Sequence, residues 1–218
     1  MRHQDIQKSM KEGSGLIRFG DEKNIQACSY DLRVGTIIKS GKVIRDTDRP
    51  NEQSVEVLPG EIVTIITLEE VTLSAKIAGL AFAMNQWSSQ GLLVLNPGHI
   101  DPGFSGPLSI KALNLRKTSI TLRFHDPIFT ILFMELAGAT DMPYPGIAKT
   151  RQDYEKSFEE RDREITPTSI ADLLRATKDL PFVTEDQLAT KMWSHGSTIL
   201  NFLITLVAVI LAIIALKK

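Results

Sequence analysis

The sequence predicts a mainly β fold, a barrel or jelly roll, followed by short helices and one C-terminal transmembrane helix. Two observations predict it. Up to about residue 140 the chain holds many short apolar runs, separated by clusters of Gly, Pro, Asn and Asp. Near its end, an apolar run covers residues 199–216 and is interrupted only by Asn201 and Thr205. The first pattern is typical of all-β domains, and the second is typical of a membrane span.

Composition agrees with one globular domain and one additional module. The 218 residues are 43% hydrophobic and 23% charged, which is enough to bury one substantial core. The net charge of −1 gives no basic footprint, so we expect no nucleic-acid polymer as a partner. One cysteine and four scattered histidines lack the spacing of zinc ligands, which argues against the zinc-dependent deaminases. The lone cysteine also fits a reducing compartment.

In chain order, we expect one short helix at residues 5–12 and then seven strands. The strands fall on apolar runs at residues 36–38, 54–58, 62–68, 92–95, 108–113, 119–124 and 128–136. Acids and bases are interspersed in residues 153–164, which predicts a solvated helix or a linker. A short amphipathic helix then begins at the cap residue Thr168 and runs to Lys178, and Thr184 resembles another helix cap.

The last apolar run is predicted to cross a membrane. Eighteen residues at about 1.5 Å each span roughly 27 Å, close to the hydrocarbon thickness of a bilayer. The alternative is a buried core helix, but such helices are normally amphipathic and this run is apolar on all sides. We therefore divide the chain into a domain at residues 1–150, a charged linker with short helices at 151–196, and an anchor at 197–218. Residues 198–216 are expected to contact the lipid bilayer.

A glycine-bounded turn at residues 98–106, GHIDPGFSG, places one carboxylate between two apolar runs. Proline fixes φ and glycine tolerates positive φ, so the turn is expected to hold Asp101 and Phe104 outward in a fixed geometry. A carboxylate beside an aromatic ring suits the recognition of a sugar and its base. The alternative is an ordinary hairpin in which the aspartate caps the turn.

Several segments together resemble the dCTP deaminase and dUTPase family over roughly residues 1–150. The more specific ones are the turn around Asp101 and residues 26–35, which read QACSYDLRVG. The supporting ones are residues 5–6, 15–17, 59–61, 68–74 and 124–128, together with Asn114. The resemblance implies a dUTPase-like β-barrel or jelly roll that forms homotrimers with nucleotide sites between subunits.

The resemblance also implies roles for single residues. Asp101 stands where the dUTPase branch orients a water toward the α-phosphate, and Phe104 stands where an aromatic ring stacks on deoxyribose. Asp31 matches an acid that is either structural or helps to hold a magnesium–triphosphate, so Mg²⁺ is the one cofactor that we consider. The residues expected to contact a deoxypyrimidine nucleotide are Ser88, Ser89, His99, Ile100, Phe104 and Lys149.

Two departures from the family pattern bear on catalysis. The family's phosphate loop reads Arg-Ser-Ser-Leu-x-Arg, whereas residues 84–91 here read MNQWSSQG and lack both arginines in either possible alignment. Deaminase members carry a Glu ten residues after the aspartate as general acid and base, and that position here is Lys111. A lysine side chain is normally protonated at neutral pH and then cannot act as the base. Lys111 is then either an exposed strand lysine or a phosphate contact.

Three functions remain open. The first is a membrane-anchored protein that binds deoxypyrimidine nucleoside triphosphates but has lost deaminase catalysis, and that acts as a sensor or assembly module. The second is an active dUTP diphosphatase or dCTP deaminase. The third is a trimeric scaffold at the membrane that binds no nucleotide, because fold alone does not decide function. We expect a single-pass C-terminal anchor with the globular domain in the cytoplasm.

Overall fold

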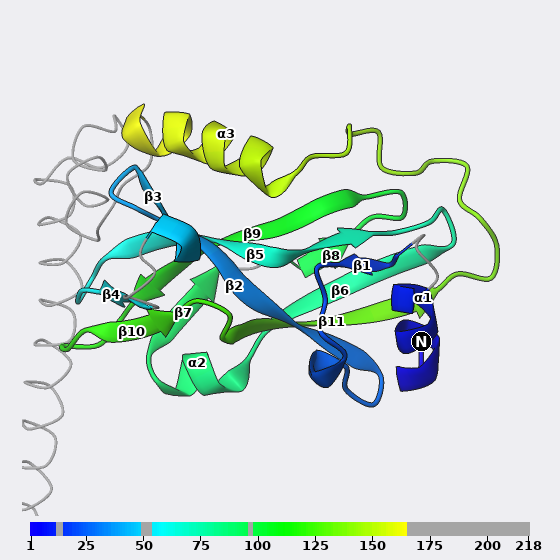
Figure 1. Cartoon of the computed structure of the whole chain (residues 1–218), viewed down its shortest axis with the longest axis horizontal. Helices are drawn as coiled ribbons and strands as arrows, with labels where there is room; N and C mark the ends of the chain where they lie inside the picture. Colours follow the sequence, from blue (N-terminus) through cyan, green and yellow to red (C-terminus); the bar gives the residue numbers. More distant parts are fainter. Residues whose placement is uncertain (12–14, 49–53, 96–97, 165–218) are drawn as a thin grey trace, which may run out of the picture. The chain divides into compact units, whose positions relative to one another are not determined.

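The structure is a computed structural model, and it describes residues 1–11, 15–48, 54–95 and 98–164. All of these residues belong to one compact unit. They form mainly β-strands with few helices (Figure 1), which confirms the mainly β part of the predicted fold class.

Eleven strands form within the described ranges, including all seven that the sequence predicts. The strands are β1 (Ile17–Arg18), β2 (Ser29–Lys39), β3 (Lys42–Arg45), β4 (Ser54–Val57), β5 (Ile62–Thr72), β6 (Ile77–Ala83), β7 (Leu92–Leu95), β8 (Gly98–Ile100), β9 (Ser105–Asn114), β10 (Ile120–Arg123) and β11 (Pro127–Glu135). The helices are α1 (His3–Lys11), α2 (Asn85–Ser89) and α3 (Arg151–Glu164), with 3-10 turns η1 (Glu22–Asn24) and η2 (Asp46–Asp48).

Antiparallel pairing joins the strands into one large and one small sheet. The path of the large, nine-stranded sheet runs β7-β9-β5-β2-β11-β6-β8, with β1 paired to β5 and β3 paired to β2. The small sheet consists of β10 and β4. Between β5 and β9 the register places Thr64 opposite Lys111 and Val71 opposite Gly106. This pairing fixes the strand that follows the Asp101 turn against the middle of the sheet.

The core gathers around β2, β5 and β11. β2 and β5 are buried on both faces over most of their length. Tyr30, Ile37, Ile65, Phe129 and Phe133 are among the largest fully or almost fully buried side chains. Burying one aliphatic or phenylalanine side chain of this size contributes about 1.5–3 kcal/mol. These central strands therefore form the rigid base from which the loops at the sheet edges project.

A buried ion pair ties the QACSYDLRVG segment to β5. Glu69 has no exposed surface, and its Oε1 accepts hydrogen bonds from Arg33 Nε over 2.6 Å and from the Tyr30 hydroxyl over 3.2 Å. Its Oε2 accepts the backbone N–H of Arg33 over 2.8 Å. Burial, and secondly the negative charge of Glu69, raises the pKa of Tyr30 to about 12. The tyrosine of this motif thus helps to satisfy a carboxylate inside the core.

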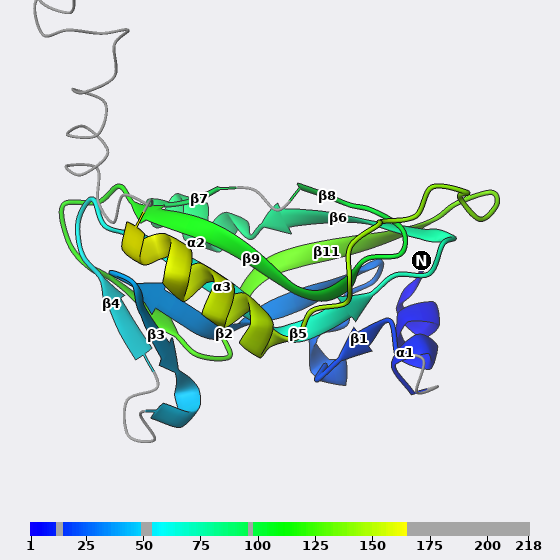
Figure 2. The same cartoon turned by 90° about the horizontal axis from the view of Figure 1, so that it is seen from above.

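The charge-rich stretch forms a helix, but the expectation that it is solvated needs correction. In Figures 1 and 2, α3 lies along the large sheet, where it contacts β9, β5 and β2. Glu155 is only 3% exposed, and its carboxylate accepts hydrogen bonds from Thr36 and Arg45. The charges of this stretch are visible in the sequence, but the hydrogen-bond partners of Glu155 are not, because Thr36 and Arg45 lie in strands more than 100 residues earlier in the chain.

In the part of the chain that the structure describes, no helix combines the length and apolar character that crossing a membrane requires. The predicted span at residues 198–216 lies outside the described residues, as do the positions predicted for the helix from Thr168 and for the cap at Thr184.

Candidate functional site

The turn around Asp101 is tight, as the sequence predicts. The backbone N–H of Phe104 donates to the carbonyl of Asp101 over 3.2 Å, and Gly103 sits at φ +86°. A Cβ at Gly103 would lie 2.9 Å from Cβ of Pro143, so both the conformation and the space require glycine here. The Asp101 side chain is 56% exposed, and its Oδ1 lies 3.3 Å from Nδ1 of His99. The carboxylate therefore faces outward beside an imidazole.

The segment that follows β11 packs against this turn. The N–H of Tyr144 donates to the carbonyl of Pro102 over 2.7 Å, and the N–H of Lys149 donates to the carbonyl of Ser105 over 3.2 Å. The rings of Phe104 and Tyr144 meet edge to face, with their centroids 5.6 Å apart. Together, the turn and the later segment form one wall with aromatic rings.

A cavity of about 270 Å³ opens beside Asp101. Its polar groups come from Asp101, His99, Ser109, Tyr144 and Tyr154. Burial, and then interaction with Tyr144, raises the pKa of Tyr154, so this phenol keeps its proton as a hydrogen-bond donor. Apolar walls complete the cavity and include Ile100, Phe104, Pro107 and Leu108. Convergent polar groups on an apolar wall are typical of a small-molecule site.

Lys111 lies next to this cavity on the same face of β9 as Ser109, because side chains two residues apart in a strand share a face. A second cavity, of about 250 Å³, is lined by Lys111, Phe158, Leu95 and Ser109, and Ser109 lines the first cavity as well. Nζ of Lys111 donates to Oγ1 of Thr64 over 2.9 Å. Lys111 is thus a half-buried, hydrogen-bonded residue and not an exposed strand lysine.

Lys149 reaches the neighbourhood of the first cavity from its rim. Its Nζ lies 5.9 Å from the centroid of the Tyr154 ring, within range of a cation–π interaction. Lys149 itself is exposed and is absent from the residues that line the cavity. The structure therefore places the Lys149 ammonium group near the predicted site, against the ring of Tyr154, which lines the cavity.

Ser88 and Ser89 lie elsewhere. Both are exposed in α2, and Figure 1 shows α2 and α3 on opposite sides of the large sheet. Ser89 Oγ donates to the carbonyl of Gln86 over 3.1 Å. In the described part of the chain, neither serine lines the cavity beside Asp101. Trp87, the residue before this serine pair, is buried and donates its Nε1–H to the carbonyl of Pro127 over 2.8 Å. Within one chain, the predicted serine pair does not meet the predicted aspartate.

Asp31 has the surroundings of a structural acid. It is 7% exposed, its Oδ1 accepts the hydroxyl of Thr130 over 2.6 Å, and its Oδ2 accepts Nε2 of Gln26 over 2.8 Å. These bonds tie β2 to β11 and to the loop before β2. Among the described residues, no group of three or more His, Cys, Asp and Glu side chains is arranged to hold a metal ion.

Sequence reasoning missed Ser109 and Tyr154 as members of the site. Ser109 could have been found from its position two residues before Lys111, because alternate residues of a strand share a face. Tyr154 and Phe158 stand four residues apart, and their rings stack with centroids 6.1 Å apart. Residues four apart lie on the same face of a helix, so this spacing in the sequence indicates that both rings lie on one face of α3.

Comparison with known proteins agrees with the motifs. Residues 1–136 match a family model described as dCTP deaminase-like. A dCTP deaminase of Pyrococcus horikoshii is 31% identical over 132 residues, which cover 60% of this chain and 82% of the relative. A dCTP deaminase described as dUMP-forming, from Methanosphaera stadtmanae, is 27% identical over 184 residues, with 69% and 93% covered.

Solved structures give weaker matches. The 2′-deoxycytidine 5′-triphosphate deaminase of Agrobacterium tumefaciens aligns with a TM-score of 0.48 at 19% identity, over 61% of this chain and 47% of that chain. A native dUTPase of EIAV aligns with a TM-score of 0.39 at 17% identity, over 61% of this chain and 94% of that chain.

Proposed function

Because the chain belongs to the dCTP deaminase-like family, we propose that it binds deoxypyrimidine nucleoside triphosphates at the Asp101 cavity without deaminating them. Binding is supported by the outward carboxylate of Asp101, the imidazole of His99 and the rings of Phe104 and Tyr144 around one cavity. The carboxylate can accept a hydrogen bond from a sugar hydroxyl, and the rings can cover an apolar sugar face.

The observation that carries the loss of deamination is the ammonium group of Lys111, bonded to Thr64 beside the cavity. The resemblance places the general acid and base of the deaminases at this position. A proton shuttle for water attack must first accept a proton, and an ammonium group has no lone pair with which to do so. Lys111 can instead attract the negative charge of a triphosphate.

A homotrimer would complete the site. Ser88 and Ser89 do not line the cavity that contains Asp101 in the described part of one chain, so a neighbouring subunit is needed to bring hydroxyl groups of that loop to a ligand. Light scattering of the full-length chain at several concentrations tests this assembly. A mass of three chains supports it, and a stable monomer that binds nucleotide contradicts it.

We also infer a membrane anchor at residues 197–218, which would gather three spans in one trimer. The support is the apolar run of the sequence alone. Alkaline extraction of membranes from cells that express the full chain tests the anchor. The protein should remain in the membrane pellet, and its release into the supernatant would exclude a spanning helix.

The binding experiment uses the full-length chain with Mg²⁺ and either dCTP or dUTP, and it follows thermal unfolding, ammonia and pyrophosphate. We expect a rise in the unfolding midpoint without either product, since a ligand bound only to the native state stabilises it. Asp101→Asn should abolish the rise. Asp141→Asn, which neutralises an exposed carboxylate outside the cavity, should leave it unchanged.

An active dUTP diphosphatase is the second candidate, and the 56% exposure of the Asp101 side chain favours it because a water could lie against the carboxylate. Pyrophosphate released from dUTP and lost in Asp101→Asn would establish that activity. A complete lack of thermal response to either nucleotide would leave the trimeric scaffold as the remaining function.

A further inference from the structure

A third cavity, separate from the Asp101 site and from the cavity beside Lys111, is lined by three arginines. It measures about 470 Å³ and lies where β1, β3 and β5 meet the start of α3. Arg18, Arg45 and Arg151 contribute the positive charges, and Glu70 and Glu155 contribute the negative ones. None of these residues lines the cavity beside Asp101. The side chains that line this cavity therefore carry a net charge of +1.

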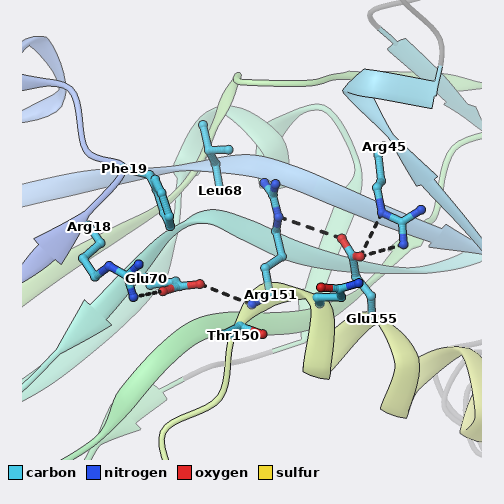
Figure 3. A pocket seen from close by; sticks show the side chains of 9 residues that line it. Arg18, Phe19, Arg45, Leu68, Glu70, Thr150, Arg151 and Glu155 are labelled. Atoms are coloured by element: carbon cyan, nitrogen blue, oxygen red, sulfur yellow. Dashed lines mark hydrogen bonds and ion pairs between the residues drawn. The ribbon is translucent and has the colours of Figure 1, made fainter.

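Two ion pairs occupy the sides of this arginine-lined cavity. Arg18 Nη1 lies 2.9 Å from Oε2 of Glu70, and Arg45 Nη2 lies 2.7 Å from Oε2 of Glu155. Both carboxylates are buried, whereas the two guanidinium groups reach the surface. In the view of Figure 3, Arg151 stands between the two pairs. Its guanidinium group is thus held among fixed charges.

Arg151 lacks a full set of hydrogen-bond partners. Its backbone N–H donates to Oε1 of Glu70 over 3.3 Å, and its Nε lies 3.9 Å from Oε1 of Glu155, beyond hydrogen-bond range. Its Nη1 is buried and has no hydrogen-bond partner among the described residues. Glu155 is already engaged, because Oε1 accepts from Thr36 and Oε2 accepts from Arg45. The Arg151 side chain as a whole is 31% exposed and lines the cavity, so the accessible part of its guanidinium group can reach a ligand there.

We propose that the arginine-lined cavity binds a phosphate group, with the guanidinium group of Arg151 as the direct donor and Arg18 as its flanking cation. Guanidinium groups suit phosphate oxygens because their N–H groups form a planar fork. Arg151 is also the first residue of α3, a helix of 14 residues, and the N-terminal end of a helix favours negative charge. The excess cation in the lining gives the site the sign that an anion needs.

Phe19 gives the proposed phosphate site an apolar wall. Its ring is 60% exposed, and the Arg18 guanidinium carbon lies 5.1 Å from its centroid. Phe19 is held at φ +59°, a conformation that non-glycine residues seldom adopt. A ring presented in this way could cover the base of a nucleotide, so the phosphate could be either free or part of a nucleoside monophosphate.

Calorimetric titration of the full-length chain with inorganic phosphate, at constant ionic strength set by sodium chloride, tests the site. We expect saturable binding that Arg151→Gln weakens about tenfold or more, as the loss of a charge-assisted hydrogen bond implies. Arg151→Lys should weaken binding as well, because it keeps the charge but loses the fork. Arg123→Gln, at an exposed arginine on β10 outside this cavity, serves as the matched control.

Equal phosphate affinity in the wild-type and Arg151→Gln proteins would overturn the proposal, and so would a wild-type protein that takes up no phosphate. Circular dichroism verifies that each variant folds, and Arg18→Gln provides a second substitution if Arg151→Gln does not. Titration with AMP then identifies the source of the phosphate. Tighter binding of AMP that Phe19→Ala returns to the level of inorganic phosphate assigns a nucleotide, and equal binding of the two assigns free phosphate. Both results support the site.

Discussion

Lys111 and Thr64 face each other across the β5–β9 pair, and the ammonium group of Lys111 donates to the hydroxyl of Thr64 over 2.9 Å. Thr64 is almost completely buried, so this bond holds the lysine side chain against the sheet. Lys111 and Phe158 both line the cavity of about 250 Å³ that adjoins the Asp101 cavity at Ser109. A positive charge is therefore a fixed part of the surroundings of the candidate site.

Lys111→Glu should introduce deaminase activity, because it supplies a carboxylate at the position of the proton shuttle. General acid–base catalysis typically contributes about 10²–10⁴-fold, so ammonia release from dCTP should rise by about 10²-fold over the wild-type background. Lys117→Glu, which makes the same charge change at an exposed position, is the control. A Lys111→Glu protein that binds dCTP but releases no ammonia would show that this lysine is not what prevents the reaction.

Phe104→Ala should weaken nucleotide binding through the loss of a ring from the cavity wall. Removing an aromatic contact of this kind costs about 0.5–1.5 kcal/mol beyond its buried area, which is roughly a two- to tenfold loss of affinity. Calorimetry with dUTP measures the change. Phe82→Ala, at an exposed phenylalanine on β6, provides the matched control. An unchanged affinity for Phe104→Ala would remove the ring from the site.

Tyr30 should make stability depend on alkaline pH. Its pKa is raised to about 12 in the folded protein, whereas an unfolded tyrosine ionises near 10. Between these values the unfolded state loses the proton first, so the free energy of unfolding should fall as pH rises from about 10 to about 12. Urea unfolding over this range measures the slope.

Tyr30→Phe should flatten that slope and should also lower stability at pH 7 by about 1–3 kcal/mol, because the Asp21 N–H and Glu69 lose a partner. Tyr144→Phe keeps these bonds and serves as the control. If the slope of Tyr30→Phe matches that of the wild type, the alkaline loss of stability arises from other groups.

Gly35→Ala should destabilise the sheet at its centre. An added Cβ would lie 2.5 Å from the N and Cα of Leu68, at the register shift between β2 and β5. Because backbone atoms cannot move aside as a flexible side chain can, we expect a loss of about 3 kcal/mol in urea unfolding. Gly138→Ala should change stability by less than about 0.5 kcal/mol, since no atom lies within 4 Å of the added Cβ. Equal effects of the two substitutions would contradict the packing at Gly35.

Strands could be predicted from the sequence wherever a local run of apolar residues coincides with a strand of the sheet, and this holds for most of the fold. Runs such as residues 62–68 and 108–113 are rich in apolar residues and lie in strands. Strand β6 was missed because its sequence, IAGLAFA, holds a glycine and three alanines, which favour strands poorly. It becomes a strand through its pairing with β11 and β8. Such long-range pairing leaves no local signal.

The candidate site was predictable only in part. The turn around Asp101 follows from its glycines and proline, which determine backbone conformation locally. The positions of Tyr154 and Arg151 depend on how α3 packs against the sheet, and the charges of that stretch suggested a solvated segment. In the proposed homotrimer a second subunit would bring Ser88 and Ser89 to Asp101, and contacts between subunits leave no local pattern in a sequence.

The most direct test follows ammonia release while dCTP is titrated into the full-length protein with Mg²⁺, with binding measured by calorimetry in the same preparation. We expect saturable binding of dCTP that Asp101→Asn abolishes, with ammonia at the level of a protein-free control. Steady release of ammonia by the wild-type protein, lost in Asp101→Asn, would contradict it, because an active deaminase cannot have lost its proton shuttle to the ammonium group of Lys111.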